Sequence, residues 1–254
     1  MRFFKILVWT ILVALVPFGT PQLLSYASGI GTAHSSWSTA RRDRTYISPS
    51  PALFKPAVIQ VFAAKTWGWR GAFAVHTWIS IKEKGAPNFT RFEVIGWRAY
   101  RGGSALTISR GYPDNYWFGN RPELLVDIRG QEAEPIIDRI KALIADYPHK
   151  KEYRLWPGPN SNSFIAHIGR QIPALKLDLP PTAIGKDYIA GGKLLGPPIS
   201  GDGFQFSLFG YAGFSYSSVQ GIEFHLFGLT TGFDFDDMTL KLPGFGRIPI
   251  KNIL

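Results

Sequence analysis

The stretch Trp156-Pro157-Gly158-Pro159-Asn160-Ser161-Asn162-Ser163-Phe164 is a rigid turn that leads into a helix. Its prolines and glycine do not continue a helix, whereas Asn and Ser are typical of helix N-termini. Apolar residues then recur at the spacing of one buried helical face, and Pro173 ends the pattern. These residues are Phe164, Ile165, Ile168 and Ile172. The sequence therefore predicts a core helix that begins at about residue 160 and ends at about residue 172.

On the N-terminal side of this helix, the pattern predicts three strands and a second helix. Alternating apolar residues indicate strands over 58–64, 73–82 and 89–100, with Trp67-Gly68-Trp69 as a turn after the first. Gly85 and Pro87 join the last two strands as a hairpin. Residues 131–147 carry isoleucines and a leucine at helical spacing, and Pro148 ends this helix.

On the C-terminal side, glycine-punctuated strands are expected over 204–209, 221–227 and 233–242. Together these elements predict an α+β fold, an antiparallel sheet with a few helices. We expect four parts along the chain. They are a signal peptide or membrane anchor over 1–27, a linker over 28–56, a core over 57–200 and a β-rich extension over 201–254 packed on that core. The many Phe, Tyr and Leu residues of the extension fit core packing, which we favour over contact with a membrane surface.

The composition excludes several classes of function. The chain has 254 residues, a net charge of +10 and no cysteine, which rules out disulfide scaffolds, thiolate metal sites and a cysteine nucleophile. The charge is concentrated in the first 70 residues, where Arg41, Arg42 and Arg44 suit anionic lipid headgroups better than a nucleic acid. Phosphate-binding and metal-binding motifs are absent from the sequence, so we expect no nucleic-acid partner, no metal and no cofactor.

The N-terminus has the pattern of an export signal or an anchor. Arg2 and Lys5 precede an uncharged run from Ile6 to Tyr26, and Ala27 is a candidate cleavage position. A run of this length also just spans a bilayer of about 30 Å as a transmembrane helix. Both alternatives, and the less favoured buried core helix, stay open, as does the membrane orientation. We favour export, and the expected partner is a membrane.

His76 is the first candidate for chemistry. If the hairpin turn is centred between Gly85 and Ala86, His76 faces Ile95 and Trp78 faces Glu93. Glu93 then lies diagonal to His76 on one face of the sheet, where a carboxylate can fix the imidazole tautomer and raise its basicity. His225 is expected on the solvent side of its strand, because Phe224 and Leu226 alternate with it.

Ser161 is the second candidate, because a nucleophile at a helix start meets unpaired backbone N–H groups that favour a developing oxyanion. For Ser163, a role as a helix cap is at least as good an explanation as a role in chemistry. Arg70 and Arg121 are candidates to clamp an anion or to stack on aromatic rings, although snorkelling from a partly buried rim explains them equally. The candidate binding residues are completed by Trp78, Trp156, Asn160 and Asn162.

Four strings carry a family resemblance: TWGWRGAFAVHTW at 66–78, GNRPELL at 119–125, WPGPNSNSF at 156–164 and LPPTAIGKDY at 179–188. With these strings, the chain resembles a bacterial membrane-associated family known only as domain of unknown function number 3750. This resemblance, together with the N-terminal segment, implies a location in a bacterial inner membrane or periplasm. More remotely, the order His76, Glu93, Ser161 is similar to permuted papain-like folds of the PPPDE, lecithin retinol acyltransferase and NlpC types. Those folds have Cys where this chain has Ser161, which is a weaker nucleophile.

These observations support a functional hypothesis and two rivals. The hypothesis is a serine-dependent hydrolase or acyl transferase acting on an envelope amide or ester, with Ser161 as nucleophile, His76 as base and Glu93 as orienting group. The first rival is a non-catalytic envelope-binding module that keeps a cleft for a lipid or cell-wall ligand. The second is a β-rich scaffold, which predicts no cleft. The sequence identifies no protein partner.

Overall fold

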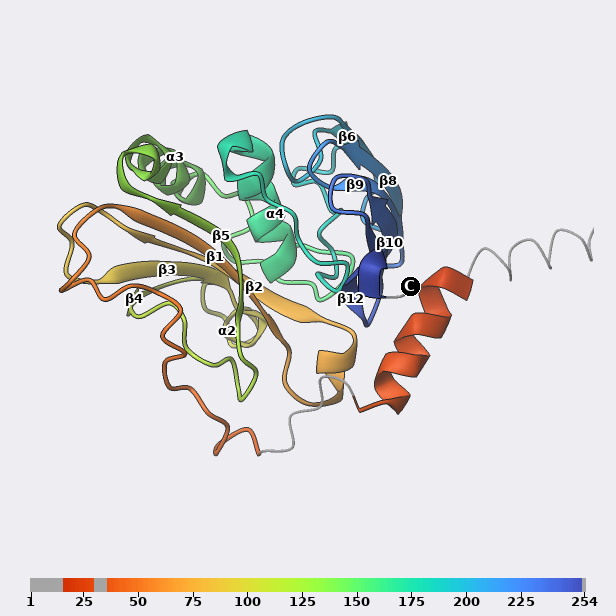
Figure 1. The fold of residues 1–254 in the computed structure, drawn as a ribbon, viewed down its shortest axis with the longest axis horizontal. Coiled ribbons are helices and arrows are strands. Elements are labelled where there is room, and N and C mark those ends of the chain that lie inside the picture. Colours follow the sequence, from red (N-terminus) through yellow and green to blue (C-terminus); the bar gives the residue numbers. More distant parts are fainter. Residues whose placement is uncertain (1–15, 30–35, 253–254) are drawn as a thin grey trace, which may run out of the picture.

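The computed structural model describes residues 16–29 and 36–252. Two antiparallel sheets lie on either side of a central helix, α4 (Ser161–Gln171), as Figure 1 shows. This arrangement confirms the predicted α+β class. The domain boundaries proposed above stay a prediction, as does the permuted papain-like character.

The first sheet carries the predicted hairpin. Its strand order is β4-β3-β2-β1-β5. The strands are β1 (Val58–Lys65), β2 (Val75–Lys82), β3 (Phe89–Val94), β4 (Leu106–Gly111) and β5 (Glu123–Arg129). Ile79 pairs with Phe92 and Ser80 with Arg91, which is the register expected for a turn centred between Gly85 and Ala86. The pairing therefore places His76 and Glu93 on the same face of the sheet.

The predicted strand over 89–100 is wrong beyond residue 94. The chain instead forms the short helix α2 (Gly96–Tyr100). A β-carbon at Gly96 would lie 2.6 Å from the Tyr153 ring, so the backbone here packs directly on that ring. This tertiary contact explains a bend that local alternation does not indicate.

The two long helices lie as predicted. Helix α3 (Ala133–Ala145) buries Ile137, Ile140 and Ile144. Helix α4 packs against β2 and β3 and buries its predicted apolar face completely. The described part also has four short 3-10 turns, which are η1 (Gly68–Ala72), η2 (Gly130–Glu132), η3 (Pro173–Leu175) and η4 (Ile250–Asn252).

The second sheet has seven strands in the order β12-β11-β10-β9-β8-β7-β6. They are β6 (Leu195–Gly196), β7 (Phe204–Leu208), β8 (Ala212–Ser217), β9 (Gly221–Leu226), β10 (Leu229–Asp234), β11 (Thr239–Leu242) and β12 (Gly246–Pro249). The single strand predicted over 233–242 is wrong. Two strands are present because a turn intervenes, in which the Asp236 N–H donates to the Asp234 carboxylate and Met238 has a positive φ of 51°.

The second sheet turns its polar face inward, which corrects two expectations. His225 is 4% exposed, whereas its neighbour Phe224 is 50% exposed. The alternation was predicted correctly, but the face directed toward the core is the polar one. The expectation that the aromatics of this extension form core packing is therefore wrong for those on the outer face.

A buried polar cluster joins this inner face to the rest of the protein. Glu223 Oε1 lies 2.8 Å from Lys186 Nζ and 2.9 Å from Lys241 Nζ, and all three side chains are fully buried. From α4, Arg170 donates to the Lys186 carbonyl and to the Gln205 side chain on β7. Charged groups in this setting are tolerated because each has an opposite charge or a carbonyl partner.

The N-terminal part is described only from residue 16. Residues 16–27 form a helix that lies beside the second sheet (Figure 1). Among the described residues, no helix is both long and apolar enough to cross a membrane. The rest of the expected signal or anchor, residues 1–15, lies outside the described residues, and so does the part of the linker over 30–35. The described linker packs on the core, where the Ser48 hydroxyl donates to Gln60.

Candidate active site

A cavity of about 510 Å³ opens between the ends of β2 and β3 and the start of α4. Its wall is mostly aromatic and apolar, and Arg70 is the one charged residue among the described residues that line it. The aromatic side chains that line it are Trp37, Trp67, Trp69, Phe73, Trp97, Tyr100, Trp117, Phe118 and Tyr153. His76 and Ser161 line it together. The presence of this cavity counts against the scaffold interpretation.

His76 is hydrogen-bonded to Glu93, as the register predicted. His76 Nε2 lies 2.8 Å from Glu93 Oε2, and both side chains are buried. Arg91 donates to the same carboxylate oxygen over 2.6 Å. Neither Arg91 nor Glu93 lines the aromatic cavity, so the two lie behind the histidine as seen from the cavity. The three residues form a chain of charge-assisted hydrogen bonds.

Aromatic rings hold the imidazole in place. The Trp117 ring stacks on His76 with 4.0 Å between centroids and 15° between planes, and the Trp78 ring lies 5.8 Å away. The Arg91 guanidinium lies 4.0 Å from the centre of the Trp78 ring. Stacking on both the histidine and its supporting arginine restricts the rotation of the imidazole.

The electrostatics favour a neutral imidazole beside an ionised carboxylate. Burial lowers the pKa of His76, and the hydrogen bond from Glu93 offsets this only in part. Burial acts to raise the pKa of Glu93, but the His76 hydrogen bond and the Arg91 charge outweigh it and the pKa is lowered. An ionised Glu93 only accepts, so His76 Nε2 carries the proton. Nδ1 then holds the lone pair, and it has no hydrogen-bond partner among the described residues.

Ser161 is the first residue of α4, and an asparagine cap fixes the helix start. The Asn160 side chain accepts from the N–H groups of Asn162 and Ser163, and Ser163 completes a capping box by accepting from the Asn160 N–H. Ser163 is thus a cap, as one of its two readings predicted. Gly185 makes room for Asn160, because a β-carbon there would lie 2.6 Å from Asn160 Nδ2.

This capping leaves the Ser161 N–H as the available donor at the helix start. Within the described residues, neither this N–H nor the Ser161 hydroxyl forms a hydrogen bond. The Thr77 hydroxyl donates to the Ser161 carbonyl and to the Asn162 side chain, which links the helix start to β2 one residue after His76. A free hydroxyl and a free N–H on one residue suit a nucleophile with its own oxyanion donor.

The other predicted binding residues are spread over several places. Asn160 and Asn162 line the cavity, and both are engaged in fixing the helix start; each donates to the Ile184 carbonyl. Arg70 lies at the cavity beside Trp69. Trp78 is fully buried behind His76 and donates to the Pro113 carbonyl. Trp156 instead packs against Tyr211 and Phe227 of the second sheet.

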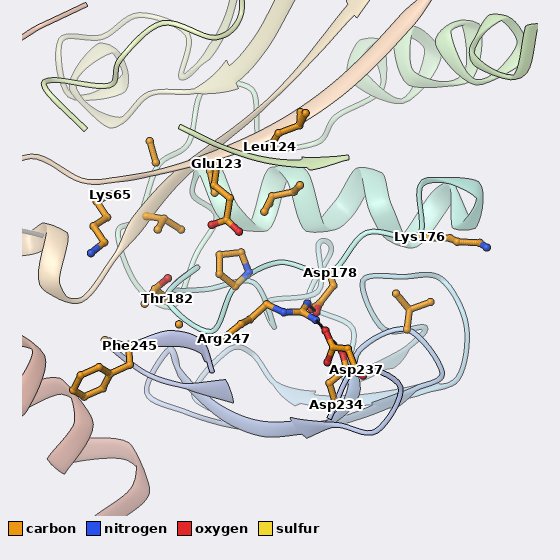
Figure 2. Close-up of a pocket in the computed structure, with 18 of the residues that line it drawn as sticks. Lys65, Glu123, Leu124, Lys176, Asp178, Thr182, Asp234, Asp237, Phe245 and Arg247 are labelled. Carbon is orange, nitrogen blue, oxygen red and sulfur yellow. Dashed lines mark hydrogen bonds and ion pairs between the residues drawn. The ribbon is translucent and has the colours of Figure 1, made fainter. Parts of the chain in front are cut away.

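Arg121 lies elsewhere, in a separate cavity of about 890 Å³ between the two sheets. Figure 2 shows this cavity, with Lys65 and Glu123 on one wall and Arg247 on the other. Arg247 is occupied by ion pairs with Asp178, Asp234 and Asp237. The structure therefore separates Arg121 from the histidine and serine.

Sequence reasoning missed Arg91 and Trp117. Arg91 had a usable signal, because it lies two residues before Glu93 on the same face of β3. Trp117 comes from an irregular segment between β4 and β5, and no local pattern connects it to His76. Such a contact depends on tertiary structure.

Comparison with protein families assigns a family to the region that contains the site. The model of a family described as protein of unknown function (DUF3750) matches residues 56–188, slightly more than half of the chain. The chain belongs to this family. The matched region contains His76, Glu93 and Ser161 and ends before the second sheet begins. Searches of curated proteins and of solved structures gave no match.

Proposed function

We propose that the protein is a serine-dependent hydrolase or acyl transferase that acts on an amide or ester of the bacterial cell envelope. The observation that carries the proposal is the shared cavity, in which an oriented neutral histidine and an unpaired serine at a helix start both line one wall. The family assignment names no activity, so the proposal depends on these residues. The remote likeness to permuted papain-like folds is consistent with their order.

In the proposed reaction, His76 Nδ1 takes the proton of the Ser161 hydroxyl while Oγ attacks the substrate carbonyl carbon. The carbonyl π electrons move to oxygen, and the Ser161 N–H stabilises that oxyanion at the positive end of α4. The intermediate collapses to an acyl-serine as the leaving amine or alcohol takes the proton from His76. Water or an acceptor alcohol then repeats the sequence and regenerates Ser161.

Glu93 and Arg91 have supporting roles in this mechanism. Glu93 holds the Nε2–H tautomer and stabilises the imidazolium that forms after proton transfer. Arg91 keeps Glu93 ionised, as the lowered pKa of Glu93 indicates. The aromatic wall suits an apolar acyl group, because such a group gains free energy by leaving water for this cavity.

One observation favours the binding-module alternative. The Ser161 hydroxyl and His76 form no hydrogen bond in the part of the chain that the structure describes. The catalytic pair has to form by rotation of Ser161 or on substrate binding, which is common in unliganded enzymes. In the alternative, the same cavity holds a lipid or cell-wall fragment and no bond is broken.

A fluorophosphonate probe distinguishes the two functions. The full chain in mild detergent is incubated with the probe and its intact mass is measured, for the parent and for Ser161→Ala, His76→Ala and Ser163→Ala. We expect one adduct on the parent, none on the first two variants, and retained labelling on Ser163→Ala, which perturbs the same helix start without removing the nucleophile. Absence of an adduct on the folded parent would reject the enzyme and favour the binding module.

A further inference from the structure

The second sheet presents an apolar face to the outside. Six of its outward side chains are between 38% and 57% exposed: Leu195, Phe204, Phe206, Leu208, Tyr216 and Phe224. They form continuous cross-strand rows, in which Leu195 pairs with Phe206, Phe206 with Phe214 and Phe214 with Phe224. The outward positions of β7, β8, β9 and β10 include no charged residue.

The inward face of the second sheet could not replace the apolar face on the outside. The inward side chains are polar, and they make hydrogen bonds and ion pairs to residues outside the sheet, as Gln205, Glu223 and Lys241 do. Turning the sheet over would expose those pairs and bury aromatic side chains where polar partners now lie. An exposed apolar face of this continuity is a typical interaction surface, because soluble monomers rarely carry one.

Aromatic residues also extend past the end of the sheet. The hairpin turns β7–β8 and β9–β10 lie side by side, since the Phe227 N–H donates to the Tyr211 carbonyl. Phe209 and Phe227 occupy these turns, with 43% and 61% of their surface exposed. The apolar surface therefore includes both the flat face and the hairpin tips.

The start of the chain indicates what covers this surface. The apolar run from Ile6 continues into the helix over 16–27, which exposes Leu23 and Leu24. That helix is fixed to the second sheet, because the Ser25 hydroxyl donates to the Gly244 carbonyl between β11 and β12. The apolar run thus meets the folded part at the β11–β12 turn of the same sheet that carries the apolar face. A single lipid bilayer accommodates both the apolar run and the apolar face.

We propose that the outward face of the second sheet docks on a lipid bilayer, with Phe206 and Phe224 in contact with the acyl chains. The sheet lies in the interfacial layer and does not span the bilayer. Its edge strands β6 and β12 have unpaired backbone groups that require water or headgroups. The hairpin tips with Phe209 and Phe227 enter the same layer. This docking does not depend on the activity proposed for Ser161.

Site-directed fluorescence tests this docking directly, because the chain has no cysteine. The full chain is prepared as Phe206→Cys and Phe224→Cys, labelled with bimane and reconstituted into vesicles of phosphatidylcholine and phosphatidylglycerol. Ile108→Cys is the matched control, since Ile108 is an apolar strand residue of the first sheet that is 59% exposed. Circular dichroism and thermal melting verify that each variant is folded.

Lipids brominated along the acyl chains are expected to quench the labels at 206 and 224 at least about twofold more than the label at 108, because apolar side chains of an interfacial surface reach the acyl boundary. Equal quenching at all three positions would overturn the proposal. So would a disulfide between two copies through Phe224→Cys that forms equally with and without vesicles, which would indicate a second copy as the occupant. Shielding of the 224 label from iodide in a lipid-free monomer would also overturn it, in favour of the chain's own N-terminal segment.

Discussion

At the scale of single residues, His76 is held between opposing influences on its protonation. Burial and the positive charge of Arg91 disfavour the imidazolium, whereas the hydrogen bond and the charge of Glu93 favour it. The net result is a pKa below the usual value, so the imidazole is neutral and basic at neutral pH. The same carboxylate therefore orients the base without keeping it protonated.

Replacing Glu93 should shift this titration in a defined direction. In Glu93→Gln, the negative charge and the charge assistance of the hydrogen bond, which both raise the pKa of His76, are lost, while burial and Arg91 remain. We expect the His76 pKa to fall further below its value in the parent. Two-dimensional NMR of the histidine Cε1–H resonances between pH 4 and pH 8 measures this shift.

His167 provides an internal control in the same spectra. Burial lowers the pKa of His167 as well, but Arg170 and His149 are the other causes and Glu93 is not among them. The His167 titration should therefore be unchanged by Glu93→Gln. A His76 pKa that rises or stays constant in this variant would contradict the electrostatic role assigned to Glu93.

At the scale of elements, the start of α4 depends on Asn160. In Asn160→Ala, the N–H groups of Asn162 and Ser163 lose their acceptor, and the carbonyls of Leu155 and Ile184 lose a donor. We expect the free energy of unfolding to fall by about 2 kcal/mol, the upper range for a helix cap. Urea denaturation followed by tryptophan fluorescence measures it.

Ser163→Ala is the matched variant, since it removes only the reciprocal half of the capping box. Its expected cost is about 1 kcal/mol. If Asn160→Ala costs no more than Ser163→Ala, the additional Asn160 contacts do not stabilise the turn, and the cap is an ordinary one.

The orientation of the second sheet predicts a contrast between two phenylalanines. Phe164 on α4 is fully buried, whereas Phe224 on β9 is half exposed. Phe164→Ala should lower the free energy of unfolding by about 3–5 kcal/mol, and Phe224→Ala should lower it by less than about 1 kcal/mol. Urea denaturation of the lipid-free chain measures both, and similar losses would show that the outward face is covered.

These elements also show what a sequence can and cannot predict here. The hairpin register and both long helices were predictable, because turn residues and apolar spacing are local signals. The juxtaposition of His76 and Glu93 followed from that register. The inward orientation of the polar face of the second sheet was not predictable. Alternation places His225 and Phe224 on opposite faces, but it does not say which of the two faces the core. Helix α2 and the Trp117 stack depend on contacts between distant segments.

At the scale of the whole molecule, Glu223 connects the second sheet to the family region. Its carboxylate lies between Lys186, which belongs to the segment after α4, and Lys241 on β11. Burial acts to raise the pKa of Glu223, but Lys186 and Lys241 outweigh it and lower the pKa to about 2. Because the folded pKa is depressed, the stabilisation is present above the unfolded value near pH 4.5 and is lost as the pH falls toward 2.

Glu223→Gln should therefore be destabilising in a pH-dependent manner. It leaves two buried ammonium groups without this counter-charge, at an expected cost of about 3 kcal/mol at pH 7. The difference between the variant and the parent should shrink as the pH is lowered from 4.5 toward 2, because Glu223 then takes up a proton in the unfolded parent while it stays ionised in the folded parent. Urea denaturation of both proteins at pH 7, 5, 4 and 3 measures the trend, with the exposed Glu134→Gln as a control that should match the parent at every pH. A difference that does not change with pH would show that Glu223 joins the two sheets by packing and hydrogen bonding, and that its charge contributes little.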